Sequence, residues 1–351
     1  MRYGFLTFGA LSNAGYIRAR ELGKALLDTG IEVAYIVSDL PENHGMLDSR
    51  SDVRFVQHGY SLRKFAERRR AIRELKLDYL EVFNDQNGLS WLTVRGLRGP
   101  KLVGIWDEAA VFKFELPWIQ RKLIVMWDRW LRRNAALRLT TTRAHQRAWK
   151  ETCAEPVVYM PHACYLTNFS EGESPYNQPT VVYMGNFHWC WDQDLIFNAF
   201  LLLKRQGLTP PLFLMGAGPD VPKWKEFIIE HGLDNITFAG YVSGESLWQH
   251  LRHAHVLLFP MRPTLRNKTR CPSKTLAYAQ ARRPIITNKV GEIAEMLGDK
   301  AIYVEPTPEG FAGGIRRAME DSDLPDVEYD LEEYTWAKNA TILLRELKTG
   351  S

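Results

Sequence analysis

Short apolar runs alternate with segments of helical periodicity along almost the whole sequence, and the alternation occurs in two series. The apolar runs that we expect to form strands in the first half are Tyr3–Phe8, Val33–Val37, Val53–Gln57, Tyr79–Phe83, Leu102–Trp106, Leu137–Thr141 and Val157–Met160. The helices expected between them include Tyr16–Asp28, Leu62–Leu75, Trp118–Asn134 and Arg143–Thr152. Strands that alternate with helices form parallel sheets with right-handed crossovers. The first half therefore predicts a doubly wound α/β domain.

A polar stretch rich in turn-forming residues, 168–179, separates this series from a second one. The strands expected there are Val181–Met184, Leu212–Met215, Ile236–Phe238, His255–Pro260, Pro284–Thr287 and Ala301–Val304. Helices expected between them include Asp192–Arg205, Pro222–His231, Glu245–His253 and Pro308–Met319. The sequence thus predicts two Rossmann-like, doubly wound parallel-sheet domains, with the boundaries 1–167 for the first, 168–179 for a linker, 180–328 for the second and 329–351 for a terminal helix. Ligands of such sheets bind at the carboxyl ends of the strands, so we expect the site in a cleft that the two domains face.

Length and composition agree with this organisation. A chain of 351 residues is too long for one ordinary core, and 45% hydrophobic with 25% charged residues is typical of soluble globular proteins. No run approaches the ~20 apolar residues of a membrane-spanning helix, and the N-terminus reads as a first strand, not a signal peptide. The four cysteines have no C-x-x-C spacing. We therefore expect neither a metal site nor disulfides, and a cytoplasmic location.

Basic residues are concentrated in the first half of the chain. Residues 1–165 contain 26 Lys and Arg against 18 Asp and Glu, whereas the remainder contains 19 against 23. One interpretation is an anionic partner of the first half, such as a phosphorylated acceptor or an acidic lipid surface. The other is a solvated basic surface. Because no nucleic-acid-binding motif accompanies the charge, we expect no nucleic-acid partner.

The helix expected at Trp118–Asn134 combines tryptophans with basic residues. Helical spacing predicts one apolar stripe, and the basic residues fall largely off it; the stripe consists of Ile119, Leu123, Met126, Trp127 and Trp130, and the basic residues are Arg121, Lys122, Arg129, Arg132 and Arg133. Helices of this kind lie on membrane interfaces, which would make the protein peripheral to the inner face of an anionic membrane. The alternative is that the stripe belongs to the core.

The segment from Cys271 to Glu295 has the clearest signs of anion binding. It follows a buried strand and opens with Cys-Pro-Ser-Lys-Thr, from which we expect an amphipathic helix that begins at Ser273. The free N–H groups and the positive dipole end of a helix attract phosphate, and Lys274 adds a full charge. We therefore expect Ser273, Lys274 and Thr275 to bind a nucleotide-sugar or a similar phosphorylated ligand.

Glycine turns follow several of the expected strands and allow backbone N–H groups to approach a ligand closely. The candidate residues in and next to these turns are Gly185, Asn186, His188, Gly216, Tyr241 and Val242 in the second domain and, on the acceptor side, Gly9, Asn13 and Gly15 in the first. We expect Tyr241 and Val242 to meet the edge of a base. For each glycine turn the alternative is that it serves packing alone.

Two adjacent carboxylates, Asp107 and Glu108, follow the strand expected at Leu102–Trp106. A carboxylate at the carboxyl end of a strand is well placed to act as a base or to bind sugar hydroxyls. Both are therefore catalytic candidates, together with Lys274. The alternative is that they cap the next helix.

The motifs of the second half resemble those of GT-B glycosyltransferases, in particular the large retaining family that includes glycogen synthases, sucrose synthases and bacterial mannosyl- and glucosyltransferases. The motifs that carry the resemblance are V-V-Y-M-G-N, L-F-L-M-G-A-G-P, N-I-T-F-A-G-Y-V, H-V-L-L-F-P, P-S-K-T-L-A-Y-A-Q-A-R-R-P-I-I and G-E-I-A-E-M-L-G-D, all within Val181–Met319. The tail from Tyr334 is similar to the family's C-terminal helix, which packs back on the first domain. The first half matches mainly in architecture.

This resemblance implies transfer of a sugar from a UDP- or GDP-linked donor to a glycan, lipid-linked or small-molecule acceptor. It implies that the second domain binds the donor, with Lys274 at the diphosphate and Arg270 or Arg266 as helpers. Basic side chains and helix N-termini neutralise the leaving diphosphate in the family, so we expect no metal and no further cofactor. We also expect a hexosyltransferase that retains the anomeric configuration.

The chain departs from the family pattern at three places. The Glu-x7-Glu pair falls at Thr269 and Ala277, and aromatic and polar residues replace the basic pair after Gly185. The active-site histidine of the family is matched by Trp106 or Asp107. Two alternatives therefore stay open, a nucleotide-sugar epimerase on the same fold and a catalytically degenerate nucleotide-sugar-binding or scaffold protein.

Overall fold

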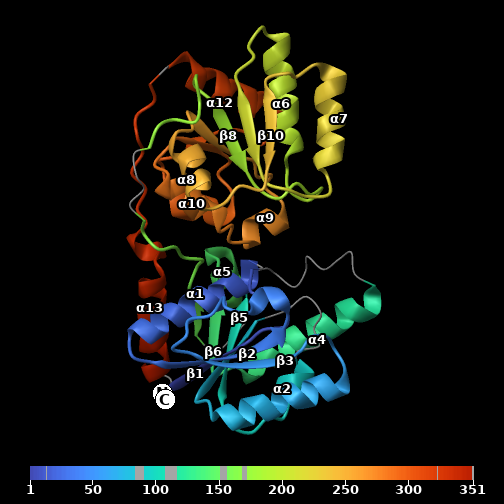
Figure 1. Cartoon of the computed structure of the whole chain (residues 1–351), viewed down its shortest axis with the longest axis vertical. Coiled ribbons are helices and arrows are strands. Elements are labelled where there is room, and N and C mark those ends of the chain that lie inside the picture. The colour runs from blue at the N-terminus through green and yellow to red at the C-terminus, as the bar shows by residue number, and fades with distance from the viewer. Residues whose placement is uncertain are drawn as a thin grey trace. The chain divides into compact units, whose positions relative to one another are not determined.

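The computed structural model describes residues 1–12, 14–83, 91–106, 117–150, 156–167, 172–321 and 323–349. The chain divides into two compact units (Figure 1). Unit 1 consists of Met1–Tyr165, Thr269–Cys271 and Glu332–Ser351, and unit 2 of Leu166–Lys268 and Pro272–Leu331. Each unit has its own parallel sheet, which confirms the predicted fold class.

Unit 1 contains a seven-stranded parallel sheet in the order β3-β2-β1-β4-β5-β6-β7. The chain first winds outward from β1 to β3 and then returns to the other side of β1, which is the doubly wound arrangement. The strands are β1 (Arg2–Leu6), β2 (Glu32–Asp39), β3 (Asp52–Gln57), β4 (Tyr79–Phe83), β5 (Lys101–Trp106), β6 (Leu137–Thr140) and β7 (Val157–Tyr159). The helices are α1 (Ala14–Asp28), α2 (Leu62–Leu75), α3 (Trp91–Val94), α4 (Trp118–Asn134), α5 (Arg143–Lys150) and α13 (Trp336–Thr349), with short 3-10 turns at Pro41–Asn43 and Glu332–Tyr334.

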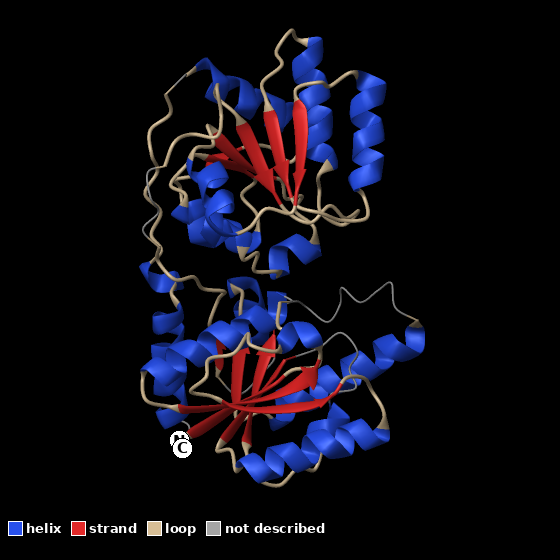
Figure 2. Cartoon of the chain, in the orientation of Figure 1, coloured by secondary structure: helices blue, strands red, loops and turns tan. Residues whose placement is uncertain are grey.

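Helices cover both faces of this sheet (Figure 2). Successive strand residues point to opposite faces, so Phe5 and Leu6 of β1 belong to different cores. On the face of Phe5, α1 lies beside the C-terminal helix α13, whose Leu343 is fully buried. On the face of Leu6, α2 and α4 complete the second core. The last helix of the chain is therefore an integral part of unit 1.

The prediction of which α4 residues form the apolar stripe is wrong in part. The structure buries Ile124, Trp127 and Leu131 against the sheet, whereas Ile119 and Met126 are exposed. The physical reason is the rotation of the helix about its own axis. Trp106, at the end of β5, donates a hydrogen bond of 2.7 Å from Nε1 to the Asp128 carboxylate and so fixes this rotation. This buried bond directs the side of α4 that carries residues 124, 127, 128 and 131 inward.

Unit 2 contains a six-stranded parallel sheet in the order β10-β9-β8-β11-β12-β13. The strands are β8 (Val181–Met184), β9 (Leu212–Met215), β10 (Ile236–Gly240), β11 (Val256–Phe259), β12 (Ile285–Thr287) and β13 (Ile302–Tyr303). The helices are α6 (Asp194–Arg205), α7 (Val221–His231), α8 (Gly244–Arg252), α9 (Leu265–Thr269), α10 (Lys274–Gln280), α11 (Gly291–Leu297) and α12 (Pro308–Glu320). The order reverses at β8, so the carboxyl ends of β8 and β11 flank the switch point at which such sheets bind ligands.

The core of unit 2 is apolar on both sides of β8. Val181 and Tyr183 pack with α6, α7 and α12, which cover one face of the sheet (Figure 1). On the other side, the ring of Tyr278 in α10 contacts Phe259 at the end of β11, with 5.9 Å between the ring centroids. Helix α10 is therefore fixed directly beside the switch point.

Part of the stretch expected to be a linker is anchored to unit 2. Residues 172–179 contain no helix or strand, but the hydroxyl of Tyr176 lies 2.9 Å from Nδ1 of His250 and its ring meets the edge of Phe213. Residues 168–171 lie outside the described ranges. In the described ranges, none of the helices has the length and apolarity needed to cross a membrane.

Candidate functional site

Three glycines bring the ends of β8, β9 and β10 into contact. The N–H of Gly185 donates to the carbonyl of Met215 at 2.9 Å, and the N–H of Gly216 donates to the carbonyl of Gly240 at 2.7 Å. Gly216 has a φ of +132°, and a Cβ at this position would overlap the carbonyl oxygen of Gly185. Only glycine satisfies both conditions. The three turns thus form one layer of backbone at the carboxyl edge of the sheet.

Lys274, the first residue of α10, reaches this layer. Its Nζ donates a hydrogen bond of 3.2 Å to the carbonyl oxygen of Met184, and it lies over the rings of Phe259 and Tyr183, at 4.2 and 4.7 Å from their centroids. A Cβ on Gly185 would come within 2.9 Å of the same nitrogen. The structure therefore brings together two of the predicted donor-site residues, Lys274 and Gly185, which are far apart in the sequence.

The other predicted residues of this helix start have different environments. Ser273 is exposed and occupies the N-cap position, but its side chain makes no capping hydrogen bond, and the helix begins one residue later than predicted. Thr275 is fully buried, so its hydroxyl does not reach the surface of unit 2. The buried Tyr278 hydroxyl accepts a 2.7 Å hydrogen bond from the N–H of Met184, and burial raises the pKa of this phenol well above its ordinary value. Tyr278 thus fixes α10 to the end of β8.

The loop after Gly185 is held by buried polar contacts. Gln193 donates from Nε2 to the carbonyl of Asn186 at 2.6 Å, and the N–H of Phe187 donates to the carbonyl of Ala217 at 2.9 Å. Asn186 itself is exposed. His188 is half-buried, and its Nδ1 lies 3.1 Å from the Sγ of Cys190. The loop is thus an ordered wall in which Asn186 faces solvent.

Beyond the end of β10, Tyr241 is 82% exposed, whereas the next residue, Val242, is half-buried. The Tyr241 ring is therefore accessible for stacking. A second exposed aromatic ring, that of Trp189, is 5.7 Å from the guanidinium of Arg266 in α9. A guanidinium at this distance from an indole ring is attracted to it electrostatically.

Two positions directly before the predicted donor segment, Thr269 and Arg270, belong to unit 1. Thr269, which aligns with the first glutamate of the family motif, is buried, and Arg270 is half-buried in the same short stretch of unit 1. Ala277, which aligns with the second glutamate, is half-buried in α10 of unit 2. At Ala277 the methyl side chain has no group with which to bind a ribose.

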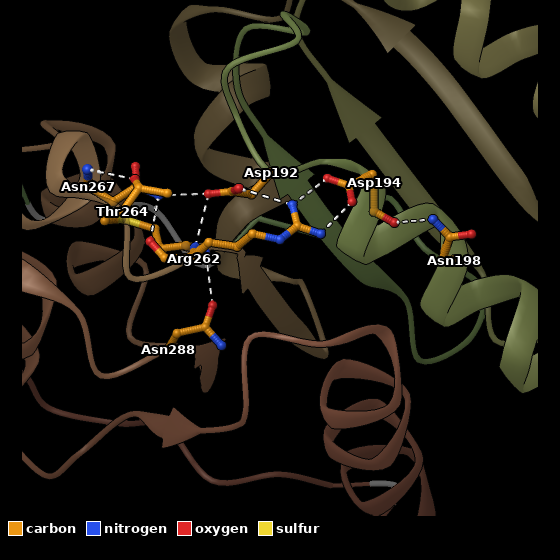
Figure 3. Close-up of polar contacts among 8 residues, drawn as sticks. Asp192, Asp194, Asn198, Arg262, Thr264, Asn267 and Asn288 are labelled. Atoms are coloured by element: carbon orange, nitrogen blue, oxygen red, sulfur yellow. Dashed lines mark hydrogen bonds and ion pairs between the residues drawn. The ribbon is translucent and has the colours of Figure 1, made fainter. Parts of the chain in front are cut away.

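Sequence reasoning missed a polar network at the switch point, shown in Figure 3. Arg262, which follows β11, forms an ion pair of 3.1 Å with Asp192 and a hydrogen bond of 2.7 Å with Asp194 at the start of α6. Hydrogen bonding to Asp194, and then to Asp192, raises the pKa of the Arg262 guanidinium. Asn267, which is 2% exposed, donates to Asp192 at 2.7 Å and to the carbonyl of Arg262 at 2.8 Å.

The network continues to the next strand of the sheet. Asn288, directly after β12, accepts a 2.8 Å hydrogen bond from the N–H of Met261 and donates a 2.7 Å hydrogen bond to the carbonyl of Val304. These bonds connect the loops that follow β8, β11, β12 and β13. The sequence gives little indication of this network, because Asp192 and Asp194 have the positions of acidic residues that are common at helix starts. The network therefore holds these loops together at the carboxyl edge of the sheet.

In unit 1, the predicted Gly9 lies in the turn after β1, and the predicted Gly15 lies in the first turn of α1. A Cβ on Gly15 would come within 2.8 Å of the Phe83 ring, so this glycine allows α1 to pack closely. Asn43, a buried residue that sequence reasoning missed, donates to the carbonyl of Gly9 at 3.2 Å and accepts from the N–H of Leu11 at 2.8 Å. Asn13 lies outside the described residues.

The catalytic candidates Asp107 and Glu108 also lie outside the described residues. The strand that precedes them ends at Trp106 as predicted. The Trp106 ring is 1% exposed and is bonded to Asp128, so it occupies the core and not a surface site. Trp106 and Asp107 are the two residues that align with the family's histidine. Because the Trp106 side chain is buried, it cannot contact a ligand as that histidine does. Within the described ranges, no three His, Cys, Asp or Glu side chains are grouped so that they could hold a metal ion.

Comparison with known proteins agrees with this geometry. Residues 178–321 match the family described as glycosyl transferases group 1. No curated protein matches the sequence. The family match covers most of unit 2, including the glycine turns, the network of Arg262 and helix α10.

Solved structures are similar over the whole chain. The sucrose-phosphate synthase of Thermosynechococcus elongatus is 15% identical with a TM-score of 0.71, and the alignment covers 99% of this chain and 97% of that one. Anabaena HepE in complex with UDP-glucose is 15% identical with a TM-score of 0.72, with 99% of each chain covered. TarM of S. aureus is 9% identical with a TM-score of 0.68, with 99% of each chain covered. These similarities show that the chain has the GT-B fold of glycosyltransferases.

Proposed function

We propose that this protein is a glycosyltransferase that moves a sugar from a nucleoside diphosphate sugar to an acceptor. The observation that carries the proposal is the position of Lys274 at the switch point of the unit 2 sheet, beside the backbone layer of Gly185. A cation at a helix start and at the carboxyl end of parallel strands is suited to a diphosphate. The match of residues 178–321 to glycosyl transferases group 1 supports the same conclusion.

In this proposal, Lys274 and the helix start at Ser273 neutralise the leaving diphosphate, while Gly185 and His188 line its other side. Helix starts and fixed cations stabilise the charge that develops as the sugar departs. Tyr241 and Val242 would meet the base. The exposure of the Tyr241 ring supports that role, because an accessible aromatic face stacks on any base.

The kind of donor is suggested by the similar structures. HepE was crystallised with UDP, with UDP and glucose, and with UDP-glucose. The TarM structure contains UDP, alpha-GlcNAc-glycerol and fondaparinux. We propose a UDP-linked hexose as the first donor to test, GDP-linked sugars as the second, and a glycan or lipid-linked acceptor.

We assign the acceptor side to unit 1, with Gly9, Asn13 and Gly15 at the β1–α1 turn and Asp107 or Glu108 as the base. A carboxylate next to the acceptor hydroxyl would take its proton as the new bond forms. Asp107→Asn should then abolish turnover with little loss of donor affinity, while Asp39→Asn, an exposed aspartate elsewhere in unit 1, should leave both unchanged. Unchanged turnover of the Asp107→Asn variant would exclude that role.

The proposal also includes retention of the anomeric configuration and independence from metal ions. The charge that a metal would supply in other transferases is assigned to Lys274, with Arg266 and Arg270 as candidate helpers. Activity should therefore persist in excess EDTA, and the product should have the anomeric configuration of the donor, as read from the anomeric coupling in a proton NMR spectrum. Loss of activity in EDTA or an inverted product would contradict these assignments.

The experiment that tests the proposal is a panel of UDP- and GDP-sugars incubated with the purified chain, with and without glycan acceptors. Glycosyl transfer predicts release of nucleoside diphosphate and a new glycoside only when an acceptor is present. An epimerised donor without any acceptor would indicate the epimerase instead. Binding of a donor without any product would indicate a degenerate binding protein, which is the alternative that Thr269 and Ala277 favour.

A further inference from the structure

The side of α4 that faces away from the sheet has an unusual composition. We call this side the outer face of α4; its residues are Trp118, Ile119, Lys122, Met126, Arg129 and Arg133. Apart from Ile119, they recur at intervals of three or four residues, so they lie along one side of the helix. Trp118 is 66% exposed, Ile119 55% and Met126 46%. Exposed apolar side chains that gather on one face, with polar residues around them, mark sites of interaction with a protein, a ligand or a membrane.

The exposed apolar side chains are not available to the core. The opposite side of α4 already supplies Ile124, Trp127 and Leu131 to the core of unit 1. The bond between Trp106 and Asp128 fixes the rotation of the helix about its axis. Turning Met126 inward would break that buried bond, so the outer face stays outside this core.

The charge on the outer face is entirely positive. Lys122, Arg129 and Arg133 are exposed, and within the described ranges none of them forms an ion pair with a carboxylate. Lys122 lies 4.8 Å from the centroid of the Trp118 ring, so cation and aromatic ring form one unit at the start of the helix. Asp128 is the only acidic residue of α4, and it is buried. The face therefore interleaves apolar groups with cations and carries no negative charge.

We propose that the outer face of α4 binds the surface of an anionic lipid membrane. In this arrangement Trp118, Ile119 and Met126 enter the boundary between headgroups and acyl chains, and Lys122, Arg129 and Arg133 contact the anionic headgroups. An amphipathic helix with a basic polar face and a tryptophan lies in the plane of a membrane for these reasons. The helix thus attaches the protein peripherally, without crossing the bilayer.

Charge argues against a second copy of the chain as the occupant. A symmetric dimer through this face would oppose the same residues of the two copies, and the three cations of each copy would repel those of the other. An anionic bilayer instead offers negative charge and an apolar layer at the same surface. The proposal of membrane binding concerns only α4 and does not depend on sugar transfer. An experiment can therefore contradict one of these two proposals without affecting the other.

The test is co-sedimentation of the full chain with vesicles of phosphatidylcholine alone or with about 30% phosphatidylglycerol, at low and high salt. We expect binding to the anionic vesicles only. Replacing three basic residues, in Lys122→Gln/Arg129→Gln/Arg133→Gln, should weaken it by roughly 100-fold, since each cation near the surface contributes about fivefold. Trp118→Ser/Met126→Ser should remove the binding that survives at high salt.

The matched control is Arg63→Gln/Arg70→Gln/Arg73→Gln, which removes the same charge from exposed positions of α2 in the same unit. This variant should bind anionic vesicles like the wild type. Equal loss of binding in both triple variants would show that net charge, not α4, is responsible, and would overturn the proposal. Failure to bind anionic vesicles, or dimers that the Trp118→Ser/Met126→Ser variant abolishes, would also overturn it. Circular dichroism and melting temperatures show whether each variant is folded.

Discussion

Lys274 donates a hydrogen bond of 3.2 Å to the carbonyl oxygen of Met184, although 90 residues separate the two in the chain. This contact joins the start of α10 to the end of β8, on the two sides of the point at which the sheet order reverses. It holds the ammonium group beside Gly185, where a ligand phosphate would meet the positive charge at the start of α10. The account of this protein as a sugar-nucleotide enzyme depends on this relationship.

Gly216 should be among the least replaceable residues of unit 2. A methyl group there would overlap the Gly185 carbonyl, and the φ of +132° is unfavourable for alanine. We expect Gly216→Ala to lower the free energy of unfolding by about 3 kcal/mol or more. Gly207→Ala is the matched control, because it also has a positive φ (+78°) but open space around it. Its cost should be about 1 kcal/mol in urea denaturation. Equal costs would contradict the close approach of the two turns.

Arg262 should stabilise unit 2 through its carboxylate partners. Arg262→Ala leaves Asp192 with one partner fewer in a half-buried position, so we expect a loss of about 1–2 kcal/mol in the free energy of unfolding. The control is Lys289→Ala, which removes an exposed ion pair with Asp299 and should cost less than about 0.5 kcal/mol. Denaturant titrations measure the free energy of unfolding of both variants. Similar values would mean that the network contributes no more than a surface pair.

Asp326 gives the protein a defined pH dependence. Hydrogen bonds from Arg252, and then from Arg283, hold the pKa of the Asp326 carboxyl below its ordinary value. Its stabilising effect is therefore complete above the pKa of the unfolded chain, about 3.9, and is lost as the pH falls through the lower pKa of the folded state. Asp326→Asn should melt at a lower temperature than the wild type at neutral pH. The difference should shrink as the pH falls below about 4.

The control for this titration is Asp234→Asn, at an exposed aspartate for which the described ranges contain no ion-pair partner. That variant should follow the wild type at every pH. A difference between Asp326→Asn and the wild type that stayed constant into acid would show that the carboxylate charge is not the cause.

The C-terminal helix should be essential for the stability of unit 1. Leu343 is fully buried in the core that α13 shares with α1. We expect Leu343→Ala to lower the free energy of unfolding by about 2–5 kcal/mol. Thr341→Ala, at an exposed position of the same helix whose hydroxyl bonds only to the carbonyl of Ala337, should change it by less than about 0.5 kcal/mol. If Leu343→Ala were equally mild, α13 would not be part of the core.

Regular elements with clear local signals were predictable from the sequence. Helix α2 has the predicted bounds because Ser61 caps its first turn by accepting from the N–H of Lys64 and Lys76 ends it in the left-handed conformation. The strand Tyr79–Phe83 also has the predicted bounds, since four of its five residues are aliphatic or aromatic. These signals are local, so they can be read without knowledge of tertiary contacts.

Features that depend on tertiary contacts were not predictable. Helix α9, Leu265–Thr269, has one apolar residue and therefore no periodicity, and it is held by Asn267 and its contacts with Asp192 and Arg262. The inward side of α4 could not be chosen from spacing alone, because apolar residues occupy several of its sides. The choice depends on the bond between Trp106 and Asp128, which are 22 residues apart. Lys274 was identified from sequence, but its position beside Gly185 needed the fold.

The most direct measurement is calorimetric titration of UDP and UDP-glucose into the wild type, Lys274→Ala and Lys225→Ala. Lys225 is an exposed lysine of α7 in the same unit and serves as the matched control. The account predicts binding by the wild type and the control, and a dissociation constant raised roughly 10- to 100-fold by Lys274→Ala, as expected for loss of a charge-assisted contact with phosphate. Nucleotide binding that is unchanged by Lys274→Ala would contradict the assignment of the donor site to the Lys274–Gly185 contact.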